Sequence, residues 1–282
     1  MNTRTLASPR FTFSAPAFPR ALQSAARALW RALPNVALGC GIPLGLLALW
    51  QFVYVQAWIA PQILPSPQQT WEGFRELYGS GDLALHLSAS LQRVAWSVAI
   101  GGVIGLALGF VLGLSSCARA WIYPSFAVFA QFPVIGWIPL LMLFIGIDEG
   151  LKITAISLAV IVPVAVSTYK GILRVPCALL EVGRVYAFSR HQSLLRIVVP
   201  AALPAIFTGV RQGVMQAWLA LIFVELLAAS EGLGFLMIWS RQLMYMDLVF
   251  VAIIAIGIIG YGLDFGLRRI EHRFNRWKPQ GL

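Results

Sequence analysis

Long apolar runs, separated by short polar stretches, dominate this chain. Each run reaches or exceeds the roughly 20 residues that a helix needs to cross a bilayer. The runs lie at residues 35–57, 87–115, 122–146, 151–170, 206–229 and 248–267. We therefore predict an all-α integral membrane protein, a polytopic bundle of about six transmembrane helices.

The composition agrees with this prediction. Of the 282 residues, 59% are hydrophobic and 11% are charged, and the mean hydropathy is +0.78. Soluble domains carry about 25% charged residues. The formal net charge of +10 could indicate nucleic-acid binding, but most basic residues lie between or outside the apolar runs, while the aromatic residues lie within or beside them. A surface that stacks bases and contacts phosphates is therefore not expected.

The charge of the connecting segments predicts the topology. The tail at 1–34 and the segments 173–205 and 271–282 are rich in arginine, whereas the stretch at 58–85 has more acids than bases. Basic loops stay on the cytoplasmic side. We expect six spans, with both termini cytoplasmic, 58–85 on the outer side of the membrane and a core of five spans at 86–270.

The first apolar run, 35–57, follows an unusually long basic leader and exceeds the length of a signal-peptide core. A retained first transmembrane helix is favoured over a signal peptide that is cleaved near Ala60.

Two of the apolar runs carry irregular residues. Glycine recurs at every fourth position from Gly101 to Gly113, which gives that helix one bare face for close helix packing. Packing within the subunit is favoured over a contact between subunits. Pro133 and Pro139 flank Gly136 in the next run, so we expect that helix to be kinked or interrupted.

The loop at 173–205 is longer than a simple connection requires. Ser189, followed three residues later by Gln192, forms a capping-box pattern. This pattern predicts one short helix that ends near Phe188 and a second that begins at Arg190, so the loop is expected to be structured.

This loop resembles the cytoplasmic "EAA" loop of binding-protein-dependent ABC importer permeases. Glu181 opens the motif, and Ile197 and Pro200 close it at the usual spacing. The sequence departs from the motif where Val182 and Gly183 replace two alanines, Ala187 replaces a glycine and Val199 replaces a leucine. The resemblance implies a coupling helix that docks on an ATPase. It assigns that contact to Glu181, Val182, Gly183, Arg184, Tyr186, Ala187, Phe188, Ser189, Ile197 and Pro200.

Further segments are similar to one branch of that family, whose members transport sulfonates, taurine, nitrate and related solutes. These segments are Ile63 to Pro67, Ser90 to Val94, Pro133 to Pro139, Gly146 to Glu149 and Ser230 to Gly234. The resemblance implies a pathway for a small anionic solute, with an aliphatic sulfonate favoured and taurine or nitrate as alternatives. It also implies a second permease subunit, expected as an identical copy, a cytoplasmic ATP-binding subunit and a periplasmic substrate-binding protein.

The chain has no G-x-x-x-x-G-K-[ST] pattern, the loop that cradles nucleotide phosphates in P-loop ATPases. We therefore expect a non-catalytic subunit without a cofactor of its own, with ATP bound by the partner. Three widely spaced cysteines and three separated histidines give no metal-ligand spacing.

Polar residues within spans are candidates for the transport pathway because lipid exposure is costly. Gln131, Gln216 and Glu225 are the candidates; the alternative for each is a satisfied hydrogen bond between helices. Arg93 and Asp264 are expected to anchor at the membrane interface. For Arg211, snorkelling to the cytoplasm and a structural ion pair remain equal alternatives.

A gradient-driven secondary transporter or channel is the second functional hypothesis. Such proteins usually show an intramembrane charge pair or an internal repeat. A membrane enzyme would need a local cluster of reactive side chains, for which the sequence gives no pattern.

Overall fold

The computed structural model describes residues 41–275 of the chain. The tail expected at 1–34, the beginning of the first expected span and residues 276–282 lie outside that part. The chain divides into two compact units, Met1–Pro61 and Gln62–Leu282. In the first unit, the apolar helix Gly41–Val55 is the described portion of the span expected at 35–57, and it is shorter than the other spans.

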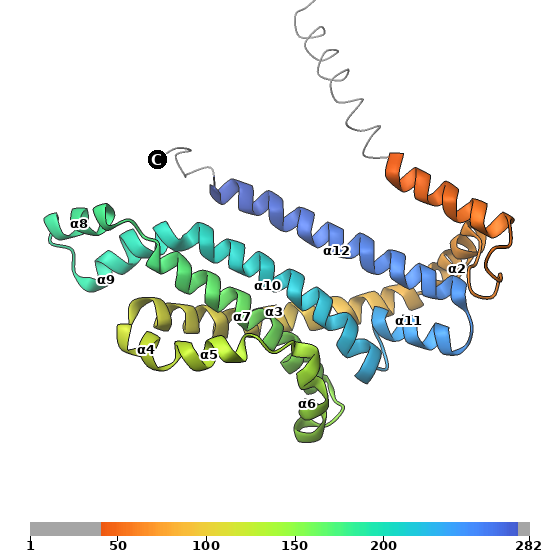
Figure 1. Cartoon of the computed structure of the whole chain (residues 1–282), viewed down its shortest axis with the longest axis horizontal. Helices are drawn as coiled ribbons and strands as arrows, with labels where there is room; N and C mark the ends of the chain where they lie inside the picture. Colours follow the sequence, from red (N-terminus) through yellow and green to blue (C-terminus); the bar gives the residue numbers. More distant parts are fainter. Residues whose placement is uncertain (1–40, 276–282) are drawn as a thin grey trace, which may run out of the picture. The chain divides into compact units, whose positions relative to one another are not determined.

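The second unit consists of helices and connecting turns, without a strand among its described residues (Figure 1). This confirms the all-α fold class. The helices are α2 (Pro67–Ser80), α3 (Asp82–Leu114), α4 (Ser116–Trp121), α5 (Tyr123–Phe129), the 3-10 turn η1 (Val134–Trp137), α6 (Ile138–Ile145), α7 (Glu149–Leu173), α8 (Cys177–Val185), α9 (Arg190–Ser193), the π-helical turn η2 (Leu194–Val198), α10 (Val199–Ala228), α11 (Leu233–Gln242) and α12 (Met246–Asn275).

Four helices in the described part are long and apolar enough to cross a membrane: α3, α7, the continuous helix Arg190–Ala228 and α12. A fifth span is formed if Ser116–Phe129 and Val134–Ile145 are taken together, although these two segments meet at 86°. The interruption predicted around Pro133 is therefore confirmed, and the run at 122–146 is not one straight helix.

The stretch at 58–85, expected as a polar loop, contains a capped helix. Ser66 accepts a hydrogen bond from the Gln69 backbone, and the Gln69 side chain accepts one from the Ser66 backbone, at 3.1 and 2.8 Å. Pro67 follows directly, where its fixed φ suits the first helical turn. Gly81, at φ 85°, ends α2 and permits the sharp turn into α3.

Helix α7 forms the centre of the bundle, and α3 packs along one side of it through the glycine face. A Cβ atom on Gly101 would lie 2.6 Å from the Ser157 carbonyl oxygen, and one on Gly109 would lie 2.5 Å from the Thr168 Cβ. These distances leave no room for any side chain. The prediction that the glycine face packs within the subunit is confirmed.

Helix α10 approaches α7 in the same manner. A Cβ on Gly209 would lie 2.5 Å from the Ser167 Cβ. Small residues therefore set the separation on both sides of α7, and the core that results includes Ile156, Val160 and Leu221, each at most 1% exposed.

This packing predicts that substitution by alanine affects stability differently at two glycines of the same helix. Gly109→Ala should destabilise the protein by about 1–3 kcal/mol, the usual effect of overpacking, because the new methyl group meets Thr168 and the Ala165 carbonyl oxygen. Gly102→Ala is the matched control, since a Cβ there meets nothing within 4 Å. Thermal unfolding in detergent measures the difference, and equal midpoints for the two variants would contradict the packing.

Candidate functional site

The 173–205 loop folds into two short helices that meet at a sharp bend. Ser189 Oγ accepts a hydrogen bond from the Gln192 backbone at 3.2 Å, and Gln192 Oε1 accepts one from the Ser189 backbone at 2.9 Å. The predicted capping box is therefore confirmed, with α9 beginning at Arg190. The first helix, expected to end near Phe188, ends at Val185, and Ala187 makes the bend at φ 50°.

Glu181, which opens the motif, does not lie in the first turn of its helix. Helix α8 begins four residues earlier, at Cys177 after Pro176. An attraction between Glu181 and the helix dipole therefore does not explain its position, because that effect falls off within the first turn.

The two ends of the motif meet in space. Gly183 is buried, and a Cβ on it would lie 2.6 Å from Cδ1 of Ile197. The Arg196 guanidinium lies 5.6 Å from the centre of the Phe188 ring, within cation–π range. Gly183, Phe188 and Ile197 therefore hold α8 against η2, which fixes the angle of the bend.

Helix α8 and its C-cap also carry exposed apolar side chains. The exposed fractions are 84% for Val185, 71% for Tyr186 and 51% for Val182. Glu181 and Arg184 are exposed beside them. A rigid, capped element with an apolar surface and charged neighbours is suited to protein contact.

Gln216 of α10 lies between two cavities. The first, about 520 Å³, has polar walls that include Arg211, Gln212 and Asp264. The second, about 480 Å³, is mainly apolar and reaches the break near Pro133. Gln216 lines both cavities, whereas Gln131 lines neither and its side chain is exposed beside the same break.

Ion pairs connect α10 to α12 beside the first cavity. Arg211 donates to Asp264 at 2.7 and 3.0 Å and to Glu271 at 2.7 Å. Arg268 also pairs with Asp264, and the Thr208 hydroxyl donates to Glu271 at 2.7 Å. Of the two alternatives left open for Arg211, the structure shows the ion pair. Asp264, expected to anchor at the interface, is a partner in it.

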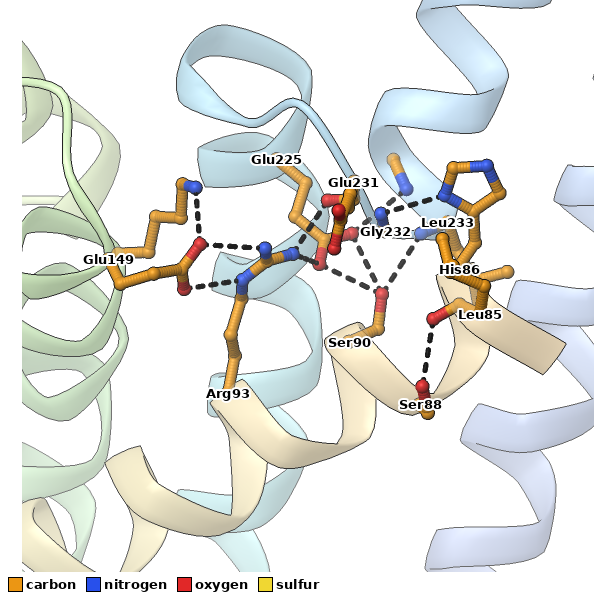
Figure 2. A network of polar contacts seen from close by, with 12 residues as sticks. Leu85, His86, Ser88, Ser90, Arg93, Glu149, Glu225, Glu231, Gly232 and Leu233 are labelled. Carbon is orange, nitrogen blue, oxygen red and sulfur yellow. Dashed lines mark hydrogen bonds and ion pairs between the residues drawn. The ribbon is translucent and has the colours of Figure 1, made fainter. Parts of the chain in front are cut away.

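Glu225 lies away from both cavities, in a buried polar network around Arg93 (Figure 2). The Arg93 guanidinium donates to both carboxylate oxygens of Glu149, at 2.9 and 2.8 Å, and to Glu225 at 2.8 Å. It also donates to the Glu231 carbonyl oxygen at 2.6 Å, and Lys152 pairs with Glu149 at 2.6 Å. We call this set of residues, together with Ser90, the Arg93 network.

Burial makes the Arg93 network important for stability. Arg93 is 6% exposed, Lys152 4% and Glu225 1%. Two cations face two carboxylates, so the network is neutral as a whole. Removing one partner of a buried ion pair typically costs about 3–5 kcal/mol, because the remaining charge is left uncompensated.

The expectation that Arg93 anchors at the interface is therefore wrong. Its partners lie 56 and 132 residues away along the chain, so helical spacing could not reveal them. The sequence did contain one indication of this network: an arginine and a glutamate each lie inside an apolar span, without an opposite charge one turn away.

Comparison with known proteins relates this geometry to a family. Residues 101–276 match the profile of the binding-protein-dependent transport system inner membrane component. Over 238 residues the chain is 34% identical to an Escherichia coli protein named as an aliphatic sulfonates transport permease, covering 84% of this chain and 90% of the relative. It is 33% identical over 253 residues to the E. coli taurine transport system permease protein, covering 88% and 92%.

A nitrate import permease protein from Synechocystis is 33% identical over 210 residues, which cover 71% of this chain and 76% of the relative. Among solved structures, an amino acid ABC transporter gives a TM-score of 0.58 at 17% identity, with 71% of this chain and 94% of that chain covered. The methionine ABC transporter in an inward-facing conformation gives 0.57 at 19% identity, covering 66% and 92%. At these identities the structural likeness concerns the fold.

If the capping box makes the 173–205 loop rigid, removing the capping side chain should loosen the loop. Ser189→Ala should destabilise α9 by about 1 kcal/mol, because the backbone donor of Gln192 loses its acceptor. Hydrogen exchange at residues 190–194 should then be roughly fivefold faster. Ser193→Ala is the matched control, since no capping bond depends on Ser193. Equal exchange in the two variants would contradict the capping role.

Proposed function

The chain belongs to the family of binding-protein-dependent transport system inner membrane components, and on that premise we propose that it is the permease subunit of an ATP-driven importer. In this proposal it lies in the bacterial inner membrane with both termini in the cytoplasm. Residues 58–85 face the periplasm, 86–270 form the permease core, and 1–34 and 271–282 are cytoplasmic tails.

The observation that carries the proposal is the 173–205 loop, which we assign as the coupling loop. Its capped bend continues without interruption into α10, so that Arg190–Ala228 is one helix. A rigid element transmits a displacement that a mobile loop would absorb. The exposed surface around Val182, Val185 and Tyr186 therefore supports docking on a cytoplasmic ATP-binding subunit, which hydrolyses ATP while this chain remains non-catalytic.

The pathway is proposed to follow the face of α10 that carries Gln216. That side chain lies where a polar cavity adjoins an apolar one, and a solute with a charged head needs both hydrogen bonding and passage through an apolar region. Gln131, exposed at the break near Pro133, remains a second candidate on this path. For Glu225, the buried contacts support a structural role instead.

The proposed solute is a small anion, with an aliphatic sulfonate favoured and taurine or nitrate as alternatives. Relatives named for aliphatic sulfonates, taurine and nitrate all match most of the chain at similar identity, and these solutes share a compact anionic group. The proposed assembly adds a second copy of this permease, two ATP-binding subunits and a periplasmic substrate-binding protein.

A gradient-driven transporter is the competing function, and the Arg93–Glu225 pair is the intramembrane charge pair such proteins use. The two side chains of this pair are 6% and 0% exposed, although Glu149, which also pairs with Arg93, is 56% exposed. A proton or ion relay needs access to water, so the burial supports a structural pair and family membership supports the importer.

The coupling loop is tested by purification with the candidate ATPase in detergent. Glu181→Lys reverses a charge and Ala187→Trp adds bulk at the bend, so each should reduce the amount of bound ATPase about tenfold. Glu72→Lys is the matched control, because Glu72 is exposed on α2, on the proposed periplasmic side. An ATPase that binds the wild type and all three variants equally, or that binds none of them, would contradict the coupling role.

The pathway is tested separately in proteoliposomes. Gln216→Leu should reduce uptake of taurine or an alkanesulfonate about tenfold while ATPase binding is retained, because one hydrogen-bonding group is removed between the two cavities. Gln68→Leu on the exposed surface of α2 is the control. Unchanged uptake by the Gln216 variant would show that Gln216 does not contribute to the pathway.

A further inference from the structure

Three segments that resemble the family branch, yet have no assigned role, meet in the Arg93 network. Ser90 and Arg93 come from α3, Glu149 from the beginning of α7, and the backbone of residues 231–234 from the end of the α10–α11 connection and the first turn of α11 (Figure 2). Because these contacts join three spans, they fix the relative positions of the helix ends that meet there.

The connection after α10 is shaped around the Glu225 carboxylate. Gly234 donates its backbone N–H to Glu225 at 2.9 Å, and Leu233 donates to the Ser90 hydroxyl at 2.9 Å. Gly232 adopts φ 119°, and a Cβ there would lie 2.2 Å from a Glu225 oxygen. Only glycine permits both the backbone angle and the close approach. The end of α10 is therefore held by its own connection as well as by Arg93.

The same helix carries the coupling loop at its other end. Arg190–Ala228 spans 39 residues, which corresponds to about 58 Å of helix. The capping box lies in its first turn, and Glu225 lies in its last turn. A displacement applied at Ser189 can therefore act along the whole helix.

The Glu225 end of α10 and the section around Arg211, near the middle of the helix, differ in the contacts that restrain them. Near Glu225 the ion pair is dry, with side-chain exposures of 6% and 0%. Near Arg211 the pair with Asp264 is partly exposed, at 26% and 18%, and both residues line the first cavity. Water can replace a partner at the exposed pair but not at the buried one, so the Arg211 contacts exchange much more readily.

We propose that Arg93 is a positioning residue for coupling: it keeps the Glu225 end of α10 fixed to α3 and α7 while the section of α10 around Arg211 moves against α12. A movement of the coupling loop then changes the cavity beside Gln216 and does not shift α10 as a whole. This inference rests on the proposed importer function and adds that the Glu225 end of α10 is the part that stays fixed.

Hydrogen exchange of the assembled permease–ATPase complex tests the proposal, with and without a non-hydrolysable ATP analogue. In the wild type, nucleotide should change exchange at residues 190–212 and leave residues 225–234 unchanged. The double variant Arg93→Met with Glu225→Gln removes both buried charges together, so no uncompensated charge remains. In it, nucleotide should change exchange at 225–234 about fivefold. Arg75→Met, an exposed arginine on α2, is the matched control.

If the double variant exchanges faster than the wild type at 225–234, and by the same factor with and without nucleotide, then the Arg93–Glu225 pair has a merely structural role. That result would overturn the proposal. A nucleotide response of 225–234 in the wild type would overturn it too. So would a double variant that does not assemble with the ATPase while the Arg75 control does, because the pair would then serve folding alone. A wild-type chain that recruits no ATPase would overturn the importer function and this inference with it.

Discussion

The close approach of α7 to its two neighbours is the constraint on which the rest of the bundle depends. In the lipid bilayer, packing and interhelical hydrogen bonds must hold helices together, because the hydrophobic effect does not drive their association there. Gly101 and Gly109 of α3 and Gly209 of α10 have no room for a side chain. With α7 held between these faces, the polar groups at the helix ends are brought to fixed distances, and Arg93 can reach Glu149 and Glu225 at once.

Buried polar contacts therefore tie the Glu225 end of α10, whereas partly exposed ion pairs hold the section of α10 around Arg211. The 86° break between the segments on either side of Pro133 and the cavities beside Gln216 lie where helices are less tightly packed. Conformational change in proteins occurs where restraints are weak. In the proposed function, a rigid coupling loop, a continuous α10 and one fixed helix end together convert a movement on the cytoplasmic side into a change of cavity shape.

Local signals in the sequence predicted local structure well. The spacing from Gly101 to Gly113, the prolines around Gly136 and the Ser189 capping box each act within one helix or one turn, so one sequence is sufficient to recognise them. The helix α2 was missed because its polar composition indicates a loop, although a second capping box was present at its beginning.

Contacts between distant segments could not be predicted in this way. Arg93 was expected at the membrane interface because its partners belong to other helices. For the same reason, the sequence could not decide whether Glu225 lines the pathway or makes a hydrogen bond between helices. An acidic residue inside a span indicates that a partner exists but does not identify it. The start of α8, four residues before Glu181, was also missed, since no capping residue marks it.

The most direct test of the account is site-specific photocrosslinking from Val185, the most exposed apolar residue of α8, in membranes that contain the candidate ATPase. The account predicts a crosslink from Val185 to the ATP-binding subunit, and none from Tyr78, which is 73% exposed on α2. A crosslink to the ATPase from Tyr78 and not from Val185 would contradict both the coupling loop and the orientation of the chain in the membrane.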